Sequence, residues 1–254
     1  MYNLIPIFTA SNKEMSVRDK IRSLLNYVHL DITQNLKYDR LTKKIIKDNI
    51  QSDHNCIDIG CHKGEILEMI LDQSPKGTHF AFEPLPDYYE KLKLNFSNSV
   101  TIYPFALSDH AGEAVFHYVK NAPAYSGIQK RKYKVQDPEI EKINVQLKNL
   151  DEVIPAEINV DFIKIDVEGG EFDVMKGAQR ILSDCKPLLI FEFGKGASDY
   201  YGANPSDIFN FLQNLGYSVF TLQNFVKNKS PFNLYDFEKV YKDNKEYYFV
   251  ASAD

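Results

Sequence analysis

Asn55-Cys56-Ile57-Asp58-Ile59-Gly60-Cys61-His62-Lys63-Gly64 is the stretch that decides the fold. Its apolar first half contains one carboxylate, Asp58, and breaks into a loop between Gly60 and Gly64. This pattern is typical of a buried strand that turns into a helix. A second apolar strand follows and ends at Glu83, 25 positions after Asp58. A glycine turn after one strand and a carboxylate after the next is how a doubly wound α/β sheet binds a nucleoside.

The spacing of the glycines narrows the choice of nucleoside. Gly60 and Gly64 give D-x-G-x-x-x-G, whereas dinucleotide-binding proteins carry G-x-G-x-x-G, which brings the backbone close to a pyrophosphate. A cofactor with a ribose but no pyrophosphate fits better, and we expect S-adenosylmethionine (SAM). The loop would offer N–H groups, Asp58 would meet the ammonium group directly or through water, and Glu83, followed by Pro84, would bind the ribose diol. The alternatives are an ordinary strand-to-helix turn and a solvated strand end.

Bulk properties exclude several classes of protein. At 254 residues, 44% of them apolar, the chain suits one large domain with little left for a second. The net charge of −5 disfavours nonspecific binding to nucleic acid. We expect no membrane span and no signal peptide, because apolar runs are short and the N-terminus lacks a basic start. Three unpatterned cysteines suggest free thiols in a reducing cytoplasm, so we expect a cytoplasmic protein.

The periodicity of apolar residues predicts the order of elements. Steps of three and four residues indicate helices over 17–50, which we interpret as an N-terminal helical cap (1–52) that packs on the domain at 53–254. Further helices are predicted from Gly64, over 86–96, over 171–183 and from Pro205. Core strands are predicted at 55–60, 78–83, 100–106, 160–166, 188–193, 217–222 and 247–251. Seven strands with intervening helices indicate an α/β fold with a mostly parallel sheet and helices on both faces.

One segment interrupts this alternation. Residues 113–119 and 143–147 alternate in polarity as strands do, so we expect an inserted hairpin at about 113–147. The polar stretch between them, 120–142, is a candidate loop or lid.

Ala106 and Leu107, which end the strand predicted at 100–106, are candidates for the wall beside the adenine ring. Small and apolar side chains at the end of a strand suit contact with a planar base. The alternative is plain core packing followed by a turn.

The second strong signal is Asp166-Val167-Glu168-Gly169-Gly170-Glu171, where a buried strand reaches the carboxyl edge of the sheet. Ligands of open α/β sheets bind at this edge. Asp166, Glu168 and Glu192, the last of which ends the next strand, are candidate catalytic residues that would deprotonate or orient a hydroxyl group. The alternative for Glu171 is a cap on the following helix. No histidine is clustered with these carboxylates, so a divalent cation is a minor alternative and we assign no metal ligands.

Two further features have a plain and a functional interpretation. His62 lies in the glycine loop, where it either faces solvent or acts near the cofactor. The basic run Lys130-Arg131-Lys132-Tyr133-Lys134 is either a solvated loop face or a contact for a phosphorylated or acidic acceptor.

Taken together, these residues resemble the FkbM family of SAM-dependent methyltransferases over roughly 35–195. The motifs that carry the resemblance, in order, are Tyr38-Asp39-Arg40-Leu41-Thr42, Ile57 to Gly64, Phe82-Glu83-Pro84, Ala106-Leu107-Ser108-Asp109, Ile163-Lys164-Ile165-Asp166-Val167-Glu168-Gly169-Gly170-Glu171, Met175, Gly177 and Ala178. The resemblance implies a Rossmann-like class I methyltransferase fold with a reversed last hairpin, SAM as methyl donor, and usually a hydroxyl acceptor on a sugar or secondary metabolite. The acceptor is not carried over, because the loop at Ser126-Gly127 lies where related chains vary.

We therefore expect a SAM-dependent O-methyltransferase that acts on a hydroxyl of a small molecule or glycan. Three alternatives remain. A NAD-dependent oxidoreductase shares the carboxylate after the second strand but requires the tighter glycine pattern. A non-catalytic SAM-binding protein would not need the carboxylates near Asp166. An RNA methyltransferase is disfavoured by the negative net charge.

Overall fold

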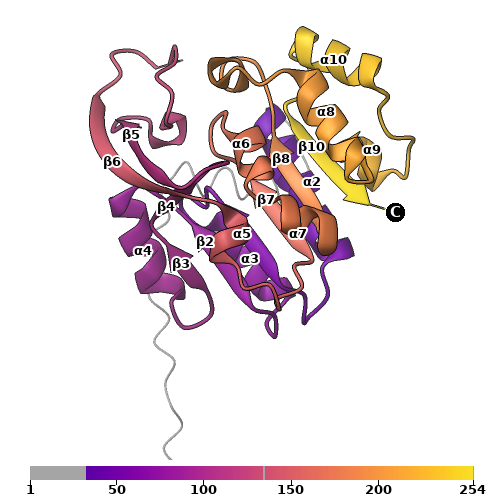
Figure 1. Ribbon diagram of the computed structural model, residues 1–254, viewed down its shortest axis with the longest axis horizontal. Helices are drawn as coiled ribbons and strands as arrows, with labels where there is room; N and C mark the ends of the chain where they lie inside the picture. Colours follow the sequence, from indigo (N-terminus) through magenta and orange to yellow (C-terminus); the bar gives the residue numbers. More distant parts are fainter. Residues whose placement is uncertain (1–32, 134, 254) are drawn as a thin grey trace, which may run out of the picture. The chain divides into compact units, whose positions relative to one another are not determined.

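The structure, a computed structural model, describes residues 33–133 and 135–253 (Figure 1). The chain divides into two units, Met1–Arg40 and Leu41–Asp254. Helix α2 (Gln34–Asn49) begins in the first unit and continues into the second. The helix predicted over 17–50 is therefore observed from Gln34, and its earlier part lies outside the described residues. The proposed packing of an N-terminal cap stays a prediction.

The second unit is built on a seven-stranded sheet with the strand order β3-β2-β1-β7-β8-β10-β9. Within the described residues, β10 is the one strand of this sheet that runs opposite to the other six, so its pairs with β8 and β9 are antiparallel. The prediction of an α/β fold with a mostly parallel sheet and a reversed last strand pair is confirmed. In spatial order the strands are Thr101–Tyr103, His79–Phe82, Cys56–Ile59, Phe162–Ile165, Leu188–Glu192, Tyr248–Ala253 and Tyr217–Thr221.

Helices pack on both faces of this sheet. Alternate apolar residues of the central strands, such as Ile57, Ile163 and Phe191, form one large core with four helices. These are α6 (Glu171–Lys176), α7 (Gln179–Asp184), α8 (Pro205–Asn214) and α10 (Leu234–Asp243). A smaller core on the opposite face contains Leu67 of α3 (Glu65–Gln73) and Leu92 of α4 (Pro86–Phe96). Short helices α5 (Leu150–Val153) and α9 (Leu222–Val226) complete the described part.

A second, three-stranded sheet has the order β4-β6-β5 and rises beside α4 in Figure 1. It contains β4 (Phe105–Leu107), β5 (Gly112–Val119) and β6 (Ile140–Lys148). The single strand predicted at 100–106 is wrong, because the chain breaks at Pro104 into β3 of the large sheet and β4 of the small one. Proline has no N–H group to donate to a neighbouring strand, so it ends the first ladder.

The helix predicted over 171–183 is also broken, at Gly177. A Cβ atom there would overlap with the backbone carbonyl of Ser108. The glycine therefore lets α6 and α7 approach the end of β4 closely, at the expense of helix continuity.

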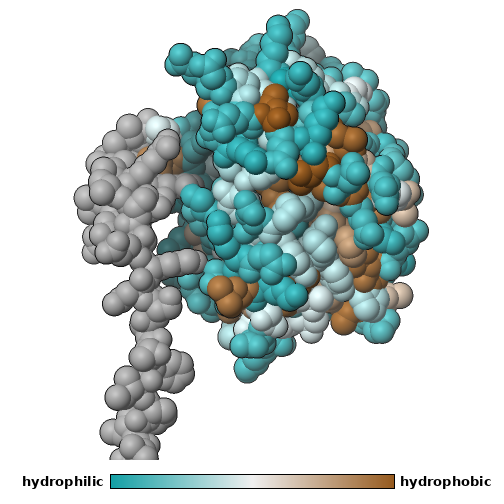
Figure 2. Space-filling view, turned by 90° about the vertical axis from the view of Figure 1, so that its left-hand side faces the viewer, coloured by the Kyte–Doolittle hydropathy of each residue, from teal (hydrophilic) through white to brown (hydrophobic). Residues whose placement is uncertain are grey.

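The described surface shows no sign of a membrane-spanning segment. None of the helices within 33–133 and 135–253 is both long enough and apolar enough to cross a membrane. The face drawn in Figure 2 is mostly hydrophilic, and the apolar side chains of its described residues form small separate patches.

Candidate functional site

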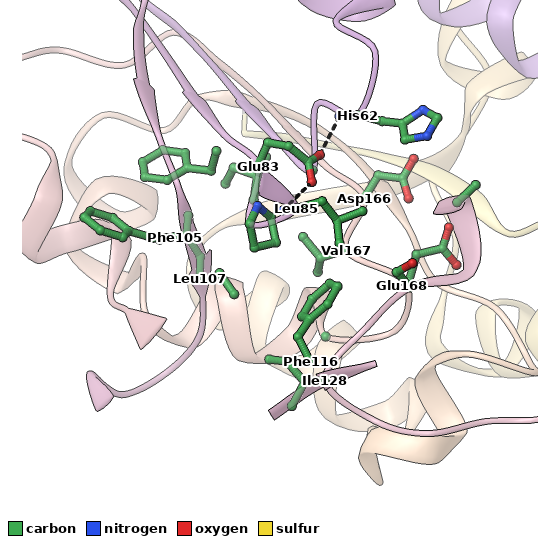
Figure 3. A pocket seen from close by; sticks show the side chains of 18 of the residues that line it. His62, Glu83, Leu85, Phe105, Leu107, Phe116, Ile128, Asp166, Val167 and Glu168 are labelled. Carbon is green, nitrogen blue, oxygen red and sulfur yellow. Dashed lines mark hydrogen bonds between the residues drawn. The ribbon is translucent and has the colours of Figure 1, made fainter. Parts of the chain in front are cut away.

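A cavity of about 150 Å³ lies at the carboxyl ends of β1, β2 and β7. Residues from β4, from β5 and from the segment 123–128 form its opposite wall (Figure 3). Most of the lining is apolar, and the charged groups stand at two places, Glu83 on one side and Asp166 with Glu168 on another. Such a largely apolar cleft with a few converging polar groups is typical of a small-molecule site.

The glycine loop that follows β1 shapes the floor of the cavity. Gly60 has a φ of 74°, and a Cβ atom there would overlap with the backbone carbonyl of Asp166. Only glycine therefore lets the ends of β1 and β7 meet at this point. Gly64 has a different place: it caps α3 and does not line the cavity, and a Cβ atom would lie 2.8 Å from Leu92 and Phe96. A side chain at this position would therefore press against α4.

Asp58 lies beneath the loop and is fully buried, so it does not line the cavity. Within the described residues, neither of its carboxylate oxygens has a hydrogen-bond partner, and the Lys164 ammonium lies 3.7 Å from Oδ1. Burial raises the pKa of Asp58, although the charge of Lys164 opposes this. Direct contact between Asp58 and a ligand would need the loop to move, whereas an electrostatic effect would not.

Glu83 lines the cavity and is held in place by the backbone. Its Oε2 accepts a hydrogen bond from the N–H of His62 at 2.8 Å, and its Oε1 accepts one from the N–H of Leu85 at 3.0 Å (Figure 3). Each oxygen keeps a further lone pair for a ligand. Burial raises the pKa of Glu83 to about 7, so the carboxylate is poised to gain from hydrogen-bond donors.

His62 is partly buried rather than solvent-facing. It has a φ of 47°, and its ring stacks on Tyr88 with 4.4 Å between ring centroids. Burial, together with the charges of Lys63 and Lys164, lowers the pKa of His62, so the ring is neutral at pH 7. Its position on the cavity wall allows the functional interpretation made from the sequence.

The two residues predicted to lie beside an adenine ring line the cavity from the small sheet, and their contact with adenine stays a prediction. Ala106 and Leu107 lie on β4 of the small sheet and line the cavity with Phe105 and Phe116. Pro84 lines it from the end of β2. The cavity thus has an apolar wall close to the carboxylate of Glu83.

Asp166 lines the far side of the cavity, and Glu192 lies behind it, beside Asp166 but outside the cavity lining. The Tyr248 hydroxyl donates a hydrogen bond to Oδ2 of Asp166, and the Lys164 ammonium lies 3.4 Å from the same atom. Although burial opposes it, Lys164 holds the pKa of Asp166 below its usual range. Burial and the charge of Asp166 raise the pKa of Glu192 well above its usual range. The opposite shifts of the two pKa values favour the negative charge on Asp166 over a charge on Glu192.

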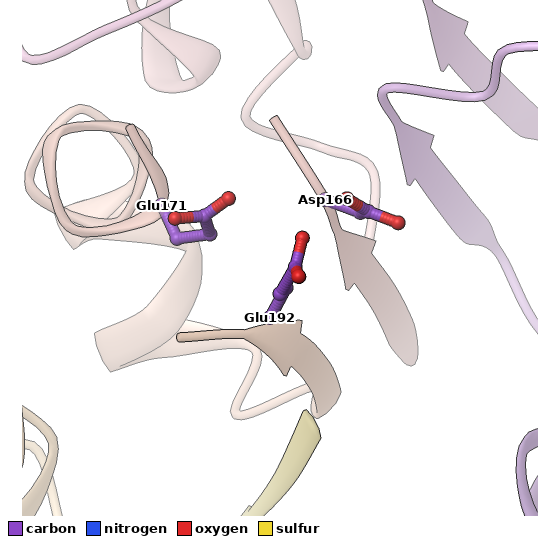
Figure 4. A group of neighbouring side chains, drawn as sticks. All are labelled: Asp166, Glu171 and Glu192. Atoms are coloured by element: carbon purple, nitrogen blue, oxygen red, sulfur yellow. The ribbon is translucent and has the colours of Figure 1, made fainter. Parts of the chain in front are cut away.

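Glu171 points toward this pair from the start of α6 (Figure 4). The carboxylates of Asp166, Glu171 and Glu192 each place an oxygen within 4.8 Å of the others. Oε1 of Glu171 accepts hydrogen bonds from the N–H groups of Val167 and Gly169, both at 3.0 Å. Glu171 thus braces the loop before the helix, a variant of the capping role expected for it. Backbone N–H groups hold Glu171, and Tyr248 and Lys164 hold Asp166, so we assign the cluster no metal.

Glu168 is paired with a cation. It has a φ of 62°, and its carboxylate accepts a hydrogen bond from the Arg131 guanidinium. Arg131 also donates to the carbonyl of Gly196 at 3.2 Å and is buried. The expectation of a solvated loop face for the basic run is therefore wrong for Arg131, whereas Lys130 and Lys132 are exposed.

Two tyrosines also fasten the segment 126–132 to the edge of the sheet. The Tyr201 hydroxyl accepts hydrogen bonds from the N–H groups of Ile128 and Gln129, at 3.0 and 3.2 Å. The Tyr200 hydroxyl accepts one from the N–H of Lys132 at 3.2 Å. Residues 126–132, part of the candidate lid, are thus hydrogen-bonded to the segment that follows β8.

Replacing Arg131 with Met is expected to loosen this segment. The change removes the cation of a buried pair and leaves Glu168 without it, which costs about 1–3 kcal/mol. Hydrogen exchange at the amides of 126–132 should become faster, while exchange in β1 and β7 stays slow. Lys132→Met, one residue away and exposed, is the control and should leave exchange unchanged. Equal exchange in both variants would show that Arg131 does not hold the segment.

Comparison with known proteins places this geometry in a family. The model of the Methyltransferase FkbM domain matches residues 58–219, more than half of the chain. Methyltransferase sdnD of Sordaria araneosa is 26% identical over 160 residues, 51% of this chain and 62% of that protein. The 2-O-methyltransferase NoeI of Sinorhizobium fredii is 26% identical over 165 residues, 59% of this chain and 67% of that protein. The AMB antimetabolite synthetase AmbE of Pseudomonas aeruginosa is 25% identical over 157 residues, 48% of this chain but 7% of that protein.

Among solved structures, the methyltransferase FkbM from Methylobacillus flagellatus is 15% identical, with a TM-score of 0.47, and the alignment covers 80% of this chain and 54% of that one. The first two curated relatives, AmbE and sdnD, are matched over less than two thirds of their own length. The family assignment rests on the domain match, which contains the glycine loop, Glu83 and the acidic cluster. The chain belongs to the FkbM family of SAM-dependent methyltransferases.

Proposed function

We propose that this chain transfers a methyl group from SAM to a hydroxyl group of a small molecule, a sugar, glycan or secondary metabolite. The observation that carries the proposal is the arrangement of one cavity. It has a backbone-braced carboxylate at Glu83, an apolar wall on β4, and an ionised carboxylate at Asp166 on another side. The relative NoeI is a 2-O-methyltransferase, so oxygen is the methylated atom in that protein.

The donor half of the cavity fits SAM. The lone pairs that Glu83 keeps suit the two hydroxyls of a ribose, and the apolar side chains of Ala106 and Leu107 suit the face of an adenine. The buried charge of Asp58, which lacks hydrogen-bond partners among the described residues, favours a cationic ligand nearby. When bound, SAM supplies a methyl group on a good leaving group.

The acceptor half is assigned to the side of Asp166. Its carboxylate is ionised, and one oxygen is held by Tyr248 and Lys164. An acceptor hydroxyl hydrogen-bonded to the carboxylate would be oriented by it and would pass its proton to it as the new oxygen–carbon bond forms. The protein does little covalent chemistry, so holding donor and acceptor in line supplies most of the rate effect. We assign Glu168 to the wall of the cavity and not to the reaction, because its carboxylate is already paired with Arg131.

Replacing Glu83 with Ala is expected to weaken SAM binding about 10- to 150-fold. The reason is the loss of a charge-assisted contact to the ribose, which is worth roughly 1.5–3 kcal/mol. Calorimetric titration of SAM into both proteins measures this, and Glu90→Ala on the exposed face of α4 is the control. Because the pKa of Glu83 is about 7, wild-type affinity should fall as the pH drops through 7. Glu83→Gln should lack this dependence. Equal affinity in the wild type and Glu83→Ala contradicts the ribose assignment.

A screen with methyl-labelled SAM then tests the reaction. Label should appear on sugars or hydroxylated metabolites, and not on acceptors whose hydroxyls are blocked. SAM binding without transfer to any acceptor would favour the non-catalytic alternative. NAD binding in place of SAM would overturn the proposal.

A further inference from the structure

Lys164 is a charged residue at the centre of the buried strand β7. Parallel pairing sets it directly opposite Asp58 of β1. Its neighbours Ile163 and Ile165 point into the large apolar core, so Lys164 and Asp58 share the opposite face of the sheet. The side chain of Lys164 is only 7% exposed. A buried ammonium is costly, so its surroundings should compensate it.

The ammonium of Lys164 touches both halves of the site. It donates a hydrogen bond to the carbonyl of Gly60 at 3.0 Å, in the loop assigned to the donor. It lies 3.7 Å from Oδ1 of Asp58 and 3.4 Å from Oδ2 of Asp166. One cation therefore stands between two carboxylates and a carbonyl oxygen. Without it, three groups of negative character would converge with no positive charge between them.

We propose that Lys164 is a positioning residue, which holds the Gly60 loop, Asp58 and Asp166 in one arrangement and so joins the donor side of the cavity to the acceptor side. The inference rests on the function proposed above. Lys164 does not line the cavity and acts through the groups it holds. The left-handed Gly60 loop and the ionised state of Asp166 both depend on its ammonium.

The test compares Lys164→Met with a matched surface lysine. Methionine keeps the length of the side chain and removes the charge. Lys176 also lies between two aspartates, 2.7 Å from Asp109 and 2.8 Å from Asp173, but is partly exposed and outside the cavity. Lys164→Met should weaken SAM binding about tenfold or more, the equivalent of a lost charge-assisted hydrogen bond, and lower Tm by roughly 10 °C. Lys176→Met should change neither by much.

A charge rescue separates positioning from packing. Adding Asp58→Asn to Lys164→Met restores the local charge balance and should recover at least half of the lost Tm, although the packing of residue 164 is unchanged. Lys164→Arg, which keeps the charge, should bind SAM more tightly than Lys164→Met. If Lys164→Met does not fold, recovery of folding in the double variant supports the proposal.

Two outcomes overturn it: SAM affinity in Lys164→Met within threefold of the wild type, or a further loss of stability when Asp58→Asn is added. The rescue is read by thermal unfolding without SAM. If the wild type does not bind SAM, the proposed function is wrong. The unfolding data still decide whether Lys164 is a positioning residue.

Discussion

Asp166→Asn is expected to lower kcat by about 100- to 10,000-fold, the usual contribution of a positioned base. The amide keeps the shape of the side chain but cannot take a proton from the acceptor. Affinity for SAM should change less than about threefold, because the lost interaction belongs to the acceptor side. Single-turnover transfer of labelled methyl to an acceptor found in the screen measures the rate, and calorimetry measures the affinity.

Glu192→Gln is the matched control for Asp166→Asn. Burial and the charge of Asp166 raise the pKa of Glu192 well above its usual range, which favours the neutral form. Glutamine imitates that form, so this variant should keep most of the activity. If Glu192→Gln transfers the methyl group slowly while Asp166→Asn stays active, Glu192 is the base and Asp166 is its partner.

The pH profile follows from the same pair. Although burial opposes it, Lys164 holds the pKa of Asp166 below its usual range. The base is therefore present above that pKa and is lost as the pH falls through it. At saturating SAM, kcat should stay level from pH 8 to below the usual range of an aspartate. The fall of SAM affinity near pH 7 should appear only in kcat/KM for SAM, because it belongs to Glu83.

Gly60→Ala is expected to have the largest effect on stability, about 3–5 kcal/mol. Two costs add: a φ of 74°, which alanine adopts poorly, and overlap of its Cβ atom with the backbone carbonyl of Asp166. Relief would require β1 and β7 to separate where the site is built, so SAM binding should also be lost. Chemical denaturation gives the free energy of unfolding.

Gly202→Ala isolates the steric part of this effect. Gly202 has a φ of 70°, and within the described residues nothing lies within 4 Å of a Cβ atom placed there. This control therefore carries only the conformational cost, about 1–2 kcal/mol. Equal losses in the two variants would show that the ends of β1 and β7 separate easily.

The sequence predicted those parts of the site whose signals are local. Gly60 and Glu83 end apolar strands, and a glycine or a carboxylate at such a position is visible without knowledge of the partner strand. The order of strands and helices is local in the same sense, because it follows from periodicity. Gly64 shows the limit of this reasoning: it fits the motif, yet the structure places it against α4.

What the sequence did not predict depends on contacts between distant segments. A lysine inside a buried strand, as Lys164 is, is a signal in the sequence, but its meaning depends on the register that sets it opposite Asp58. Nothing local to the basic run shows that Arg131 meets Glu168, 37 positions away. Tyr201 and Tyr248 resemble core aromatic residues until their hydroxyl partners are known.

Pro104 divides what would otherwise be one strand into β3 of the large sheet and β4 of the small sheet. The pairing of β3 with the large sheet ends there. The chain then enters the small sheet, a ribbon in which β6 pairs with both β4 and β5. Residues can be inserted or removed at the tip of this ribbon without a shift in the register of the large sheet. Changes confined to that tip would leave β4 and the large sheet in place, and with them the residues assigned to the methyl donor.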